Sequence, residues 1–514
     1  MFPEDFLWGV SEAGFQFEMG DPLGGNVDPN TDWFKWVHDP VNVRSKIVSG
    51  DLPENGVDYW ELYNADHELA KGLGMNAYRL GVEWSRIFPK NTFEVKVDVE
   101  TKQGRIIRID IDDKALEKLE NLASVDALNR YEKIIDNLRE KGFKVIVCLN
   151  HFTLPIWVHD PIAVRDSGLR RGPRGWYDQE TIVEFSKYAA FLAWRLGGKV
   201  DMWATLNEPN IVAETGYFMT GNGFPPGVRT NALNAFKNFK RVLINMIVAH
   251  ARAFEALKKF DSQRADPDSP LPAWIGVIQH VIPVMPLDPS NEGDSHASRF
   301  LRHVHNNLFI QAVSSGWVDT NLNMVREGEE FEKHLEGKLD WLGVNYYTRM
   351  VVKGTKSLLA RLFMGIQGVP EIMEGYGLTC KPKDVSRGDR PTSDFGWELY
   401  PEGLAEMLVE MSKYGRPMFV TENGVADSED TLRPRYIVEH LRVLEEIVNR
   451  KSVDVRGYFH WALTDNYEWA QGFSMRFGLY SVDLNTKKRT PRKSSVETLR
   501  RIIQNRTVDS IVSR

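Results

Sequence analysis

Short runs of apolar and β-branched residues alternate with longer amphipathic stretches about eight times along the 514 residues of this chain. Such alternation is typical of βα units around a parallel sheet, and eight units predict a closed (β/α)8 barrel of the α/β class. Most of the short runs are almost continuously apolar, as expected for strands that are covered on both faces. The predicted strands span residues 6–10, 76–82, 143–149, 201–206, 274–278, 339–345, 417–421 and 455–461.

Hydrophobic periodicity predicts a helix after each of these strands. The predicted helices span residues 58–73, 112–140, 181–196, 231–260, 295–316, 401–414, 432–449 and 494–505. Long segments rich in turn residues also follow several strands, at 22–56, 90–104, 221–227 and 353–393. Because the chemistry of such barrels lies on the loops that follow the strands, we expect these segments to build the walls of an active site. The sequence contains no interdomain linker, so residues 1–514 are predicted to form one catalytic domain.

Charge and cysteine content exclude several classes of function. The 64 basic and 71 acidic residues give a formal charge of −7, which argues against a nucleic-acid partner. Two cysteines cannot form a disulfide framework, and no signal-peptide pattern precedes the first strand, so we expect a cytoplasmic location. A spanning helix is not expected either, since that needs about 18 consecutive apolar residues. The short apolar segment 358–364 leaves peripheral membrane contact open.

Two glutamates at predicted strand ends carry the main functional signal: Glu208, within Thr205 to Pro209, and Glu422, within Val420 to Gly424. Cleavage of a glycosidic bond uses one carboxyl group to protonate the leaving oxygen and another to attack or stabilise the anomeric carbon. Most glutamates are solvated surface charges, so either residue alone would be weak evidence. The pair gains weight because polar or aromatic residues follow nearly every predicted strand: Gln16, Arg79, His151, Asn207, Tyr347, Trp461, Glu468 and Trp469.

A series of short motifs runs in order along essentially the whole chain. They are Phe15-Gln16-Phe17-Glu18, Tyr78-Arg79, Glu83-Trp84-Ser85-Arg86, Asn150-His151-Phe152, Leu206-Asn207-Glu208-Pro209, Gly343 to Thr348, Thr421-Glu422-Asn423-Gly424, and Trp461 with Asp465 to Trp469. With these motifs the chain resembles a retaining β-glycosidase of glycoside hydrolase family 1, particularly its archaeal, heat-adapted branch.

The resemblance implies that Glu208 is the general acid and base and that Glu422 is the nucleophile. Arg79, if it lies beside Glu422, would keep that carboxylate ionised, and the charge of Glu422 would raise the pKa of Glu208. The resemblance also implies supporting roles for Asn207, facing the sugar 2-hydroxyl, and for Tyr347, donating to Glu422. For a retaining enzyme we expect the two carboxyl groups to lie about 5–5.5 Å apart.

Substrate-binding residues follow from the same matching positions. Gln16, His151 and Glu468 are expected to bind sugar hydroxyls, and Trp461 and Trp469 to pack against the apolar face of the sugar; Trp397 is expected on the side of the leaving group. Ordinary core packing is the alternative for the tryptophans. At the end of the fifth strand, where the family commonly has an asparagine, the sequence reads Ile278-Gln279-His280-Val281, which leaves open whether His280 lies near the site.

No metal or other cofactor is expected. His151 has no second ligand at metal-binding spacing, and His303 and His305, two positions apart on a predicted helix, should face different ways. Asp112 is expected to cap the helix that follows it.

The expected substrate is a small, unphosphorylated β-glucoside or β-galactoside, because a carboxylate at Glu468 would repel a phosphate. A β-mannosidase on the same site is the alternative, followed by a protein that binds sugar without cleaving it. The chain is also expected to associate with identical chains, as a dimer or a tetramer.

Overall fold

The computed structural model describes residues 1–21, 23–356, 369–450 and 452–512. The segment 358–364, singled out for membrane contact, lies outside these residues. Eight strands have the bounds β1 (Leu7–Ser11), β2 (Ala77–Gly81), β5 (Lys144–Cys148), β6 (Met202–Asn207), β7 (Ile275–His280), β9 (Trp341–Asn345), β12 (Met418–Asn423) and β13 (Val455–His460). They close into a barrel of order β1-β13-β12-β9-β7-β6-β5-β2, and every neighbouring pair is parallel. The predicted (β/α)8 fold is confirmed.

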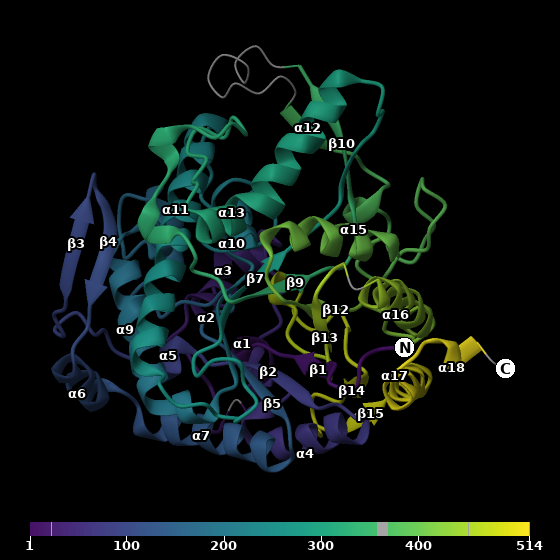
Figure 1. Ribbon diagram of the computed structural model, residues 1–514, viewed down its shortest axis with the longest axis horizontal. Helices are drawn as coiled ribbons and strands as arrows, with labels where there is room; N and C mark the ends of the chain where they lie inside the picture. Colours follow the sequence, from purple (N-terminus) through teal and green to yellow (C-terminus); the bar gives the residue numbers. More distant parts are fainter. Residues whose placement is uncertain (22, 357–368, 451, 513–514) are drawn as a thin grey trace.

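A helix follows each barrel strand and packs outside it (Figure 1). These helices are α4 (Tyr59–Gly72), α7 (Val125–Glu140), α9 (Glu180–Leu196), α11 (Ala232–Phe260), α13 (Leu308–Ser315), α15 (Glu402–Met411), α16 (Arg433–Asn449) and α17 (Lys493–Asn505). Shorter elements fill the connections: α1 (Gly14–Phe17), α2 (Asp32–Val37), α3 (Pro40–Arg44), α5 (Trp84–Ile87), α6 (Asp113–Leu122), α8 (Pro161–Ser167), α10 (Pro209–Tyr217), α12 (Glu292–Arg302), α18 (Asp509–Val512), β3 (Asp98–Lys102), β4 (Arg105–Asp110), β8 (Val284–Pro286), β10 (Met350–Thr355), β11 (Val369–Ile372), β14 (Tyr480–Val482) and β15 (Arg489–Pro491).

Two of the helices predicted as continuous are interrupted in the structure. The stretch 112–140 is two helices, α6 and α7, because the Ser124 side chain accepts a hydrogen bond from the Ala127 backbone N–H and so caps a new helix. The prediction that Asp112 caps α6 is confirmed, since its carboxylate accepts from Ala115 N at 2.8 Å. The stretch 295–316 is divided into α12, a π-helical turn over His303–Asn307 and α13.

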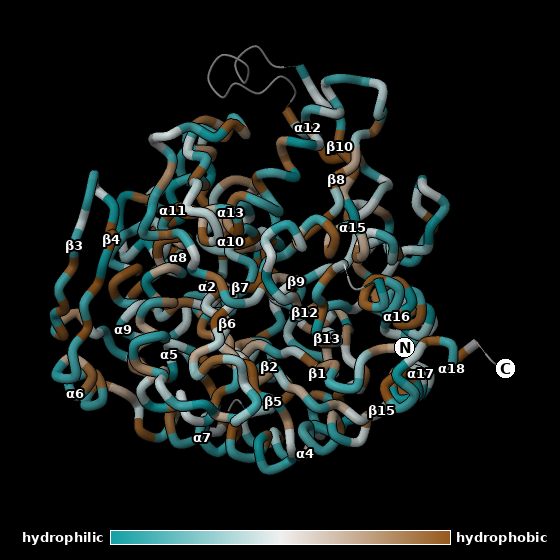
Figure 2. The backbone as a smooth tube through the Cα atoms, viewed as in Figure 1, coloured by the Kyte–Doolittle hydropathy of each residue, from teal (hydrophilic) through white to brown (hydrophobic). Residues whose placement is uncertain are grey.

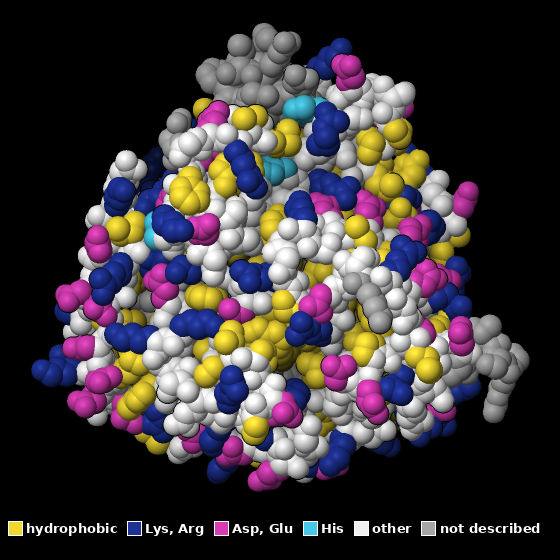
Figure 3. All heavy atoms as spheres, in the orientation of Figure 1, with side chains coloured by type: hydrophobic (Ala, Val, Ile, Leu, Met, Phe, Trp, Pro, Cys, Tyr) yellow, Lys and Arg dark blue, Asp and Glu magenta, His cyan; other side chains and the backbone are white. Residues whose placement is uncertain are grey.

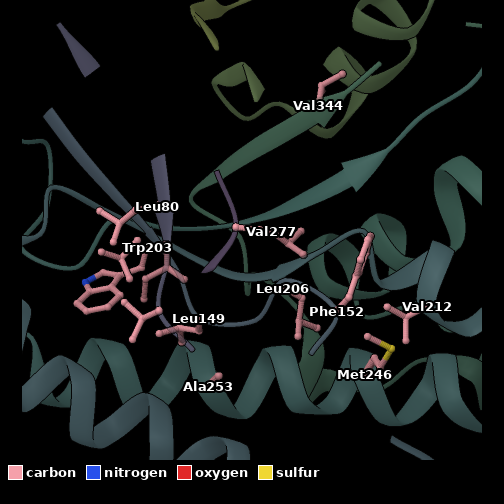
Figure 4. Close-up of a cluster of buried hydrophobic side chains, with 14 of the residues drawn as sticks. Leu80, Leu149, Phe152, Trp203, Leu206, Val212, Met246, Ala253, Val277 and Val344 are labelled. Atoms are coloured by element: carbon pink, nitrogen blue, oxygen red, sulfur yellow. The ribbon is translucent and has the colours of Figure 1, made fainter. Parts of the chain in front are cut away.

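The core has an inner and an outer part, which follow from the alternation of side chains along the strands. On β5, Ile146 and Cys148 point into the barrel, whereas Val145 and Val147 face the helices. Figure 4 shows the outer part near α11, where Met246 and Ala253 lie below Leu206 and the Trp203 ring. The inner cluster fills the lower part of the barrel and leaves its upper end for polar residues.

The surface is polar and mixed in charge. Basic and acidic side chains are interspersed over the face drawn in Figure 3. The hairpin of β3 and β4 is mostly hydrophilic in Figure 2, and every residue of β3 is exposed. In the described part of the chain, no helix has both the length and the apolar character to cross a bilayer.

Candidate active site

A cavity of about 820 Å³ lies where the barrel strands end. Both glutamates singled out from the sequence line it, together with His151, Tyr347, Trp397, Trp461, Glu468, Trp469 and His280. Arg79, Asn207 and Gln16 lie directly behind these residues and are at most 1% exposed. The structure therefore brings all the sequence-predicted site residues to one end of the barrel.

Glu422 lies on β12 and Glu208 directly follows β6, and both of these strands are irregular at this end. The pairing of β6 with β7 shifts between Ala204 and Asn207, and the pairing of β12 with β9 shifts between Val420 and Glu422. Such bulges re-aim side chains, because an extra residue on one strand breaks the strict alternation. Glu208 and Glu422 consequently both reach the cavity.

Glu422 is held by two donors. Arg79 Nη1 lies 2.7 Å from Oε1, and the Tyr347 hydroxyl donates to Oε2 at 2.7 Å. The carboxylate is 4% exposed and the arginine fully buried, so this ion pair is shielded from solvent. Two hydrogen bonds on separate oxygens, one of them from a guanidinium group, fix the orientation of Glu422.

Glu208 has a different environment. Its backbone is left-handed, with φ of 48°, a conformation that costs on the order of 1–3 kcal/mol for a residue other than glycine. One carboxyl oxygen accepts from Asn345 Nδ2 at 2.8 Å, and no basic side chain donates to it among the described residues. Burial, reinforced by the negative charge of Glu422, raises the pKa of Glu208 well above its ordinary value.

Asn207 and His151 are in direct contact, with Asn207 Nδ2 lying 3.2 Å from His151 Nε2. Asn207 Oδ1 accepts from Arg79 Nη2 at 2.8 Å and from Asn345 Nδ2 at 3.1 Å, so the orientation of the amide is fixed and its Nδ2 carries the two N–H donors. Arg79 Nη2 also lies 3.2 Å from His151 Nδ1. Both ring nitrogens of His151 therefore face donors, Arg79 at Nδ1 and Asn207 at Nε2, and a neutral ring can accept from only one of them. Burial and the charge of Arg79 lower the pKa of His151, which keeps the ring neutral.

A second polar group lies around Glu468. Gln16 Nε2 donates to Asn466 Oδ1 at 3.0 Å and faces Glu468 Oε2 at 3.4 Å. Burial, and after it the charge of Glu422, raise the pKa of Glu468 to about 8. This carboxyl group can therefore either donate or accept a hydrogen bond near neutral pH.

Aromatic rings form the remaining walls. The His151 ring is nearly parallel to the rings of Trp461 and Trp469, with centroids 6.0 and 5.8 Å away. Farther out, Trp397 stacks on Phe395 at 4.4 Å and lies 5.5 Å from Tyr347. Trp461 and Trp469 are almost completely buried, whereas Trp397 is half-buried.

Asn345 was absent from the predicted site residues, yet its amide donates to both Asn207 and Glu208. The signal was present in the sequence: positions 341, 343 and 345 share the inward face of β9, and 345 ends the strand. His280, whose position the sequence leaves open, lines the cavity, and its ring centroid lies 6.3 Å from that of Tyr347. Within the described residues, no group of three or more His, Cys, Asp or Glu side chains is arranged to hold a metal ion.

Known proteins resemble the chain over almost its full length. Residues 1–98 and 120–507 match Glycosyl hydrolase family 1. A β-galactosidase of Pyrococcus woesei is 48% identical over 517 aligned positions, which cover 99% of this chain and 98% of that protein. The solved structure of the β-glycosidase from the hyperthermophile Thermosphaera aggregans is 44% identical, with a TM-score of 0.87 and coverage of 98% and 97%. A β-glucosidase mutant derived from a hyperthermophilic tetrameric structure is 42% identical, with a TM-score of 0.84 and coverage of 98% and 96%.

Proposed function

Because the chain belongs to glycosyl hydrolase family 1, it is a β-glycosidase, and we propose that Glu208 and Glu422 cleave terminal β-D-glucosides and β-D-galactosides with retention of configuration. The observation that carries this assignment is the contrast between the two carboxyl groups. Glu422 receives hydrogen bonds from Arg79 and Tyr347, while Glu208 is buried with a raised pKa. One group is suited to attack and the other to deliver a proton.

In the first step, Glu208 gives its proton to the glycosidic oxygen as the bond from that oxygen to the anomeric carbon breaks. A carboxylate oxygen of Glu422 forms a new bond to the same carbon, which gives a covalent glycosyl-enzyme and a free alcohol. Arg79 and Tyr347 hold Glu422 still, so little reorganisation is needed at the moment of attack.

In the second step, Glu208, now ionised, takes a proton from water while that water attacks the anomeric carbon. The bond to Glu422 breaks, and both residues return to their starting states. Two inversions at the same carbon give a product with the configuration of the substrate.

Sugar recognition is assigned to the donors and rings around the two glutamates. Asn207 Nδ2 would donate to the 2-hydroxyl, and His151 beside it would bind a neighbouring hydroxyl. Gln16 and Glu468 would bind the hydroxyls farther from the anomeric carbon, and the rings of Trp461 and Trp469 would cover the apolar face. Glu468 can donate or accept, which suits either epimer at the 4-position.

We also propose where the enzyme is located in the cell and that it assembles with identical chains. We infer a cytoplasmic location from the two unpaired cysteines, Cys148 and Cys380. An assembly of identical chains is supported by the tetrameric origin of one similar β-glucosidase.

A panel of 4-nitrophenyl β-glycosides that differ at the 2- and 4-hydroxyls tests the function. We expect release of nitrophenol from the glucoside and galactoside, and the β-anomer as the first sugar product by proton NMR. Faster cleavage of the mannoside would favour the alternative substrate. Initial release of the α-anomer would refute the retaining mechanism, and no release from any glycoside would leave only sugar binding.

A further inference from the structure

A row of three polar side chains lies beside Glu208, on the side of the cavity away from Gln16 and Glu468. Glu214 of α10 accepts from His305 Nδ1 at 2.9 Å, and His305 Nε2 lies 2.9 Å from Nδ1 of His280, the last residue of β7. All three residues line the cavity. Neither the acid–base chemistry nor the sugar contacts proposed above use them.

The protons in this row can be placed from its ends. Both carboxyl oxygens of Glu214 face His305 Nδ1, at 3.0 and 2.9 Å, so Nδ1 is the donor of the ring and Nε2 presents a lone pair. Asn210 Nδ2, oriented by the backbone carbonyls of His280 and His305 at 3.0 and 3.1 Å, also lies 3.2 Å from that Nε2. Because the Asn210 amide nitrogen is a donor, its position next to His305 Nε2 argues against a proton on that nitrogen.

His280 must then donate from Nδ1 to His305, which leaves its Nε2 as an acceptor. Within the described residues this Nε2 has no hydrogen-bond partner, and it is not sealed from the cavity. The ring is half-buried and nearly parallel to that of Tyr347, at 21°. Burial and the neighbouring His305 lower the pKa of His280, so it stays a neutral acceptor rather than a cation.

The backbone is built to bring this row together. Gly276, Ile278 and His280 share the inward face of β7, so His280 points into the barrel mouth. His305 lies in the π-helical turn His303–Asn307, an arrangement that is frequent at functional sites. Gln279 Nε2 ties the His305 carbonyl to β7 at 2.7 Å. His303, in the same turn, faces Asp319 instead.

We propose that His280 Nε2 accepts a hydrogen bond from a hydroxyl of the leaving group, so that Glu214 and His305 position His280 to favour sugars over apolar alcohols as leaving groups. The inference rests on the proposed function, because it needs Glu208 to be the residue that protonates the leaving oxygen. The strand order supports a position on the leaving-group side: β7 lies next to β6, which Glu208 directly follows, and other strands separate β7 from β1 and β13 in both directions around the barrel.

The test compares two glucosides whose leaving groups are both alkyl alcohols. The leaving group of cellobiose is glucose, which carries further hydroxyls. The leaving group of octyl β-glucoside is octanol, which carries none besides the one freed by cleavage. Both leaving groups require protonation by the general acid. For His280→Leu we expect the ratio of kcat/KM for cellobiose to that for octyl glucoside to fall about 10-fold, as for loss of one hydrogen bond. His280→Gln, which places an amide oxygen near the same point, should restore most of the ratio.

Two further variants separate positioning from structural damage. Glu214→Gln should lower the same ratio, because an amide can donate to His305 and reverse the direction of the row. His303→Gln is the matched control from the same π-helical turn and should leave the ratio unchanged. Melting temperatures of all variants show that each protein compared is folded.

The proposal is overturned if the ratio is unchanged in His280→Leu, or if the parent cleaves octyl glucoside but no disaccharide. Equal losses on both alkyl glucosides, with 4-nitrophenyl glucoside spared, would show that His280 acts through Glu208 and would also overturn it. A parent inactive on every β-glycoside is a separate result: it refutes the proposed function itself.

Discussion

The inner and outer halves of the cavity are built in different ways. The inner half, around Glu422, comes from strand ends: Arg79, Asn207 and Asn345 are fully buried and joined by hydrogen bonds of 3.1 Å or less. The outer half comes from loops, and its rings, such as Phe395 and Trp397, are half-buried. Chemistry that depends on fixed charges is placed on the rigid scaffold, and contact with the leaving group on the connections.

The two halves of the cavity should differ in how well they tolerate substitutions. A buried network loses much when one member is removed, because its partners are left unpaired in a medium of low dielectric. A half-buried ring loses only its own contact area. Substitutions should therefore have effects that decrease from the inner half to the outer half, and the following predictions test that order.

Glu422→Ala should have the largest effect. Without the nucleophile we expect turnover to fall by on the order of 10⁴–10⁶ on every substrate. The matched control is Glu184→Gln, since Glu184 is also buried, with 2% exposure against 4% for Glu422, but pairs with Lys187 on α9, outside the cavity. Turnover of Glu422→Ala within about tenfold of the control would contradict the role of Glu422 as the nucleophile.

Glu208→Gln should follow, with an effect that depends on the leaving group. We expect kcat/KM to fall about 10²–10⁴-fold for octyl β-glucoside, and much less for 4-nitrophenyl β-glucoside, whose leaving group needs little protonation. The raised pKa gives the pH dependence: the parent is active while Glu208 is protonated and loses activity as pH rises through that pKa. This alkaline decline should vanish in the variant, and its persistence would contradict the acid role.

Tyr347→Phe removes one hydrogen bond to Glu422 and leaves the ion pair with Arg79. A hydrogen bond to a charged group corresponds to a loss of about 10- to 100-fold in kcat/KM. Tyr346→Phe is the control, because the neighbouring hydroxyl donates instead to the Tyr400 carbonyl. Equal losses in both variants would indicate general damage to β9 and not a specific role for Tyr347.

Trp397→Ala should have the smallest effect of the four. We expect a roughly 3- to 10-fold increase in KM for aryl glycosides with little change in kcat, because an aromatic contact with the leaving group contributes about 0.5–1.5 kcal/mol. A loss of kcat as large as that of Tyr347→Phe would show that the two halves are not energetically separate.

The inner half could be predicted from the sequence because its residues occupy regular positions. Arg79 lies on the inward face of a strand that is recognisable as an apolar run, so the barrel alone brings it to the site; Asn345 occupies such a position on β9 but was not among the predicted site residues. The order of motifs matched to a known family added the roles of Glu208 and Glu422. These roles, the one-domain organisation and the expected separation of about 5–5.5 Å between the carboxyl groups remain predictions.

Three features could not be predicted, for physical reasons. The break at Ser124 lies in a stretch without Gly or Pro, where one capping hydrogen bond outweighs a periodicity that continues on both sides. The π-helical turn at His303–Asn307 leaves no mark in composition. The contact of His305 with Glu214 joins positions 91 apart and depends on that turn.

The central claim is that Glu422 forms a bond to the sugar while Glu208 transfers protons. A 2-deoxy-2-fluoro-β-glucoside with a good leaving group tests it, because the fluorine destabilises the oxocarbenium-like transition state and the leaving group keeps the first step faster than the second. We predict that the enzyme is inactivated with one sugar bound per chain, and that peptide mass spectrometry finds this sugar on Glu422. Attachment to Glu208 or to any other residue would contradict the account.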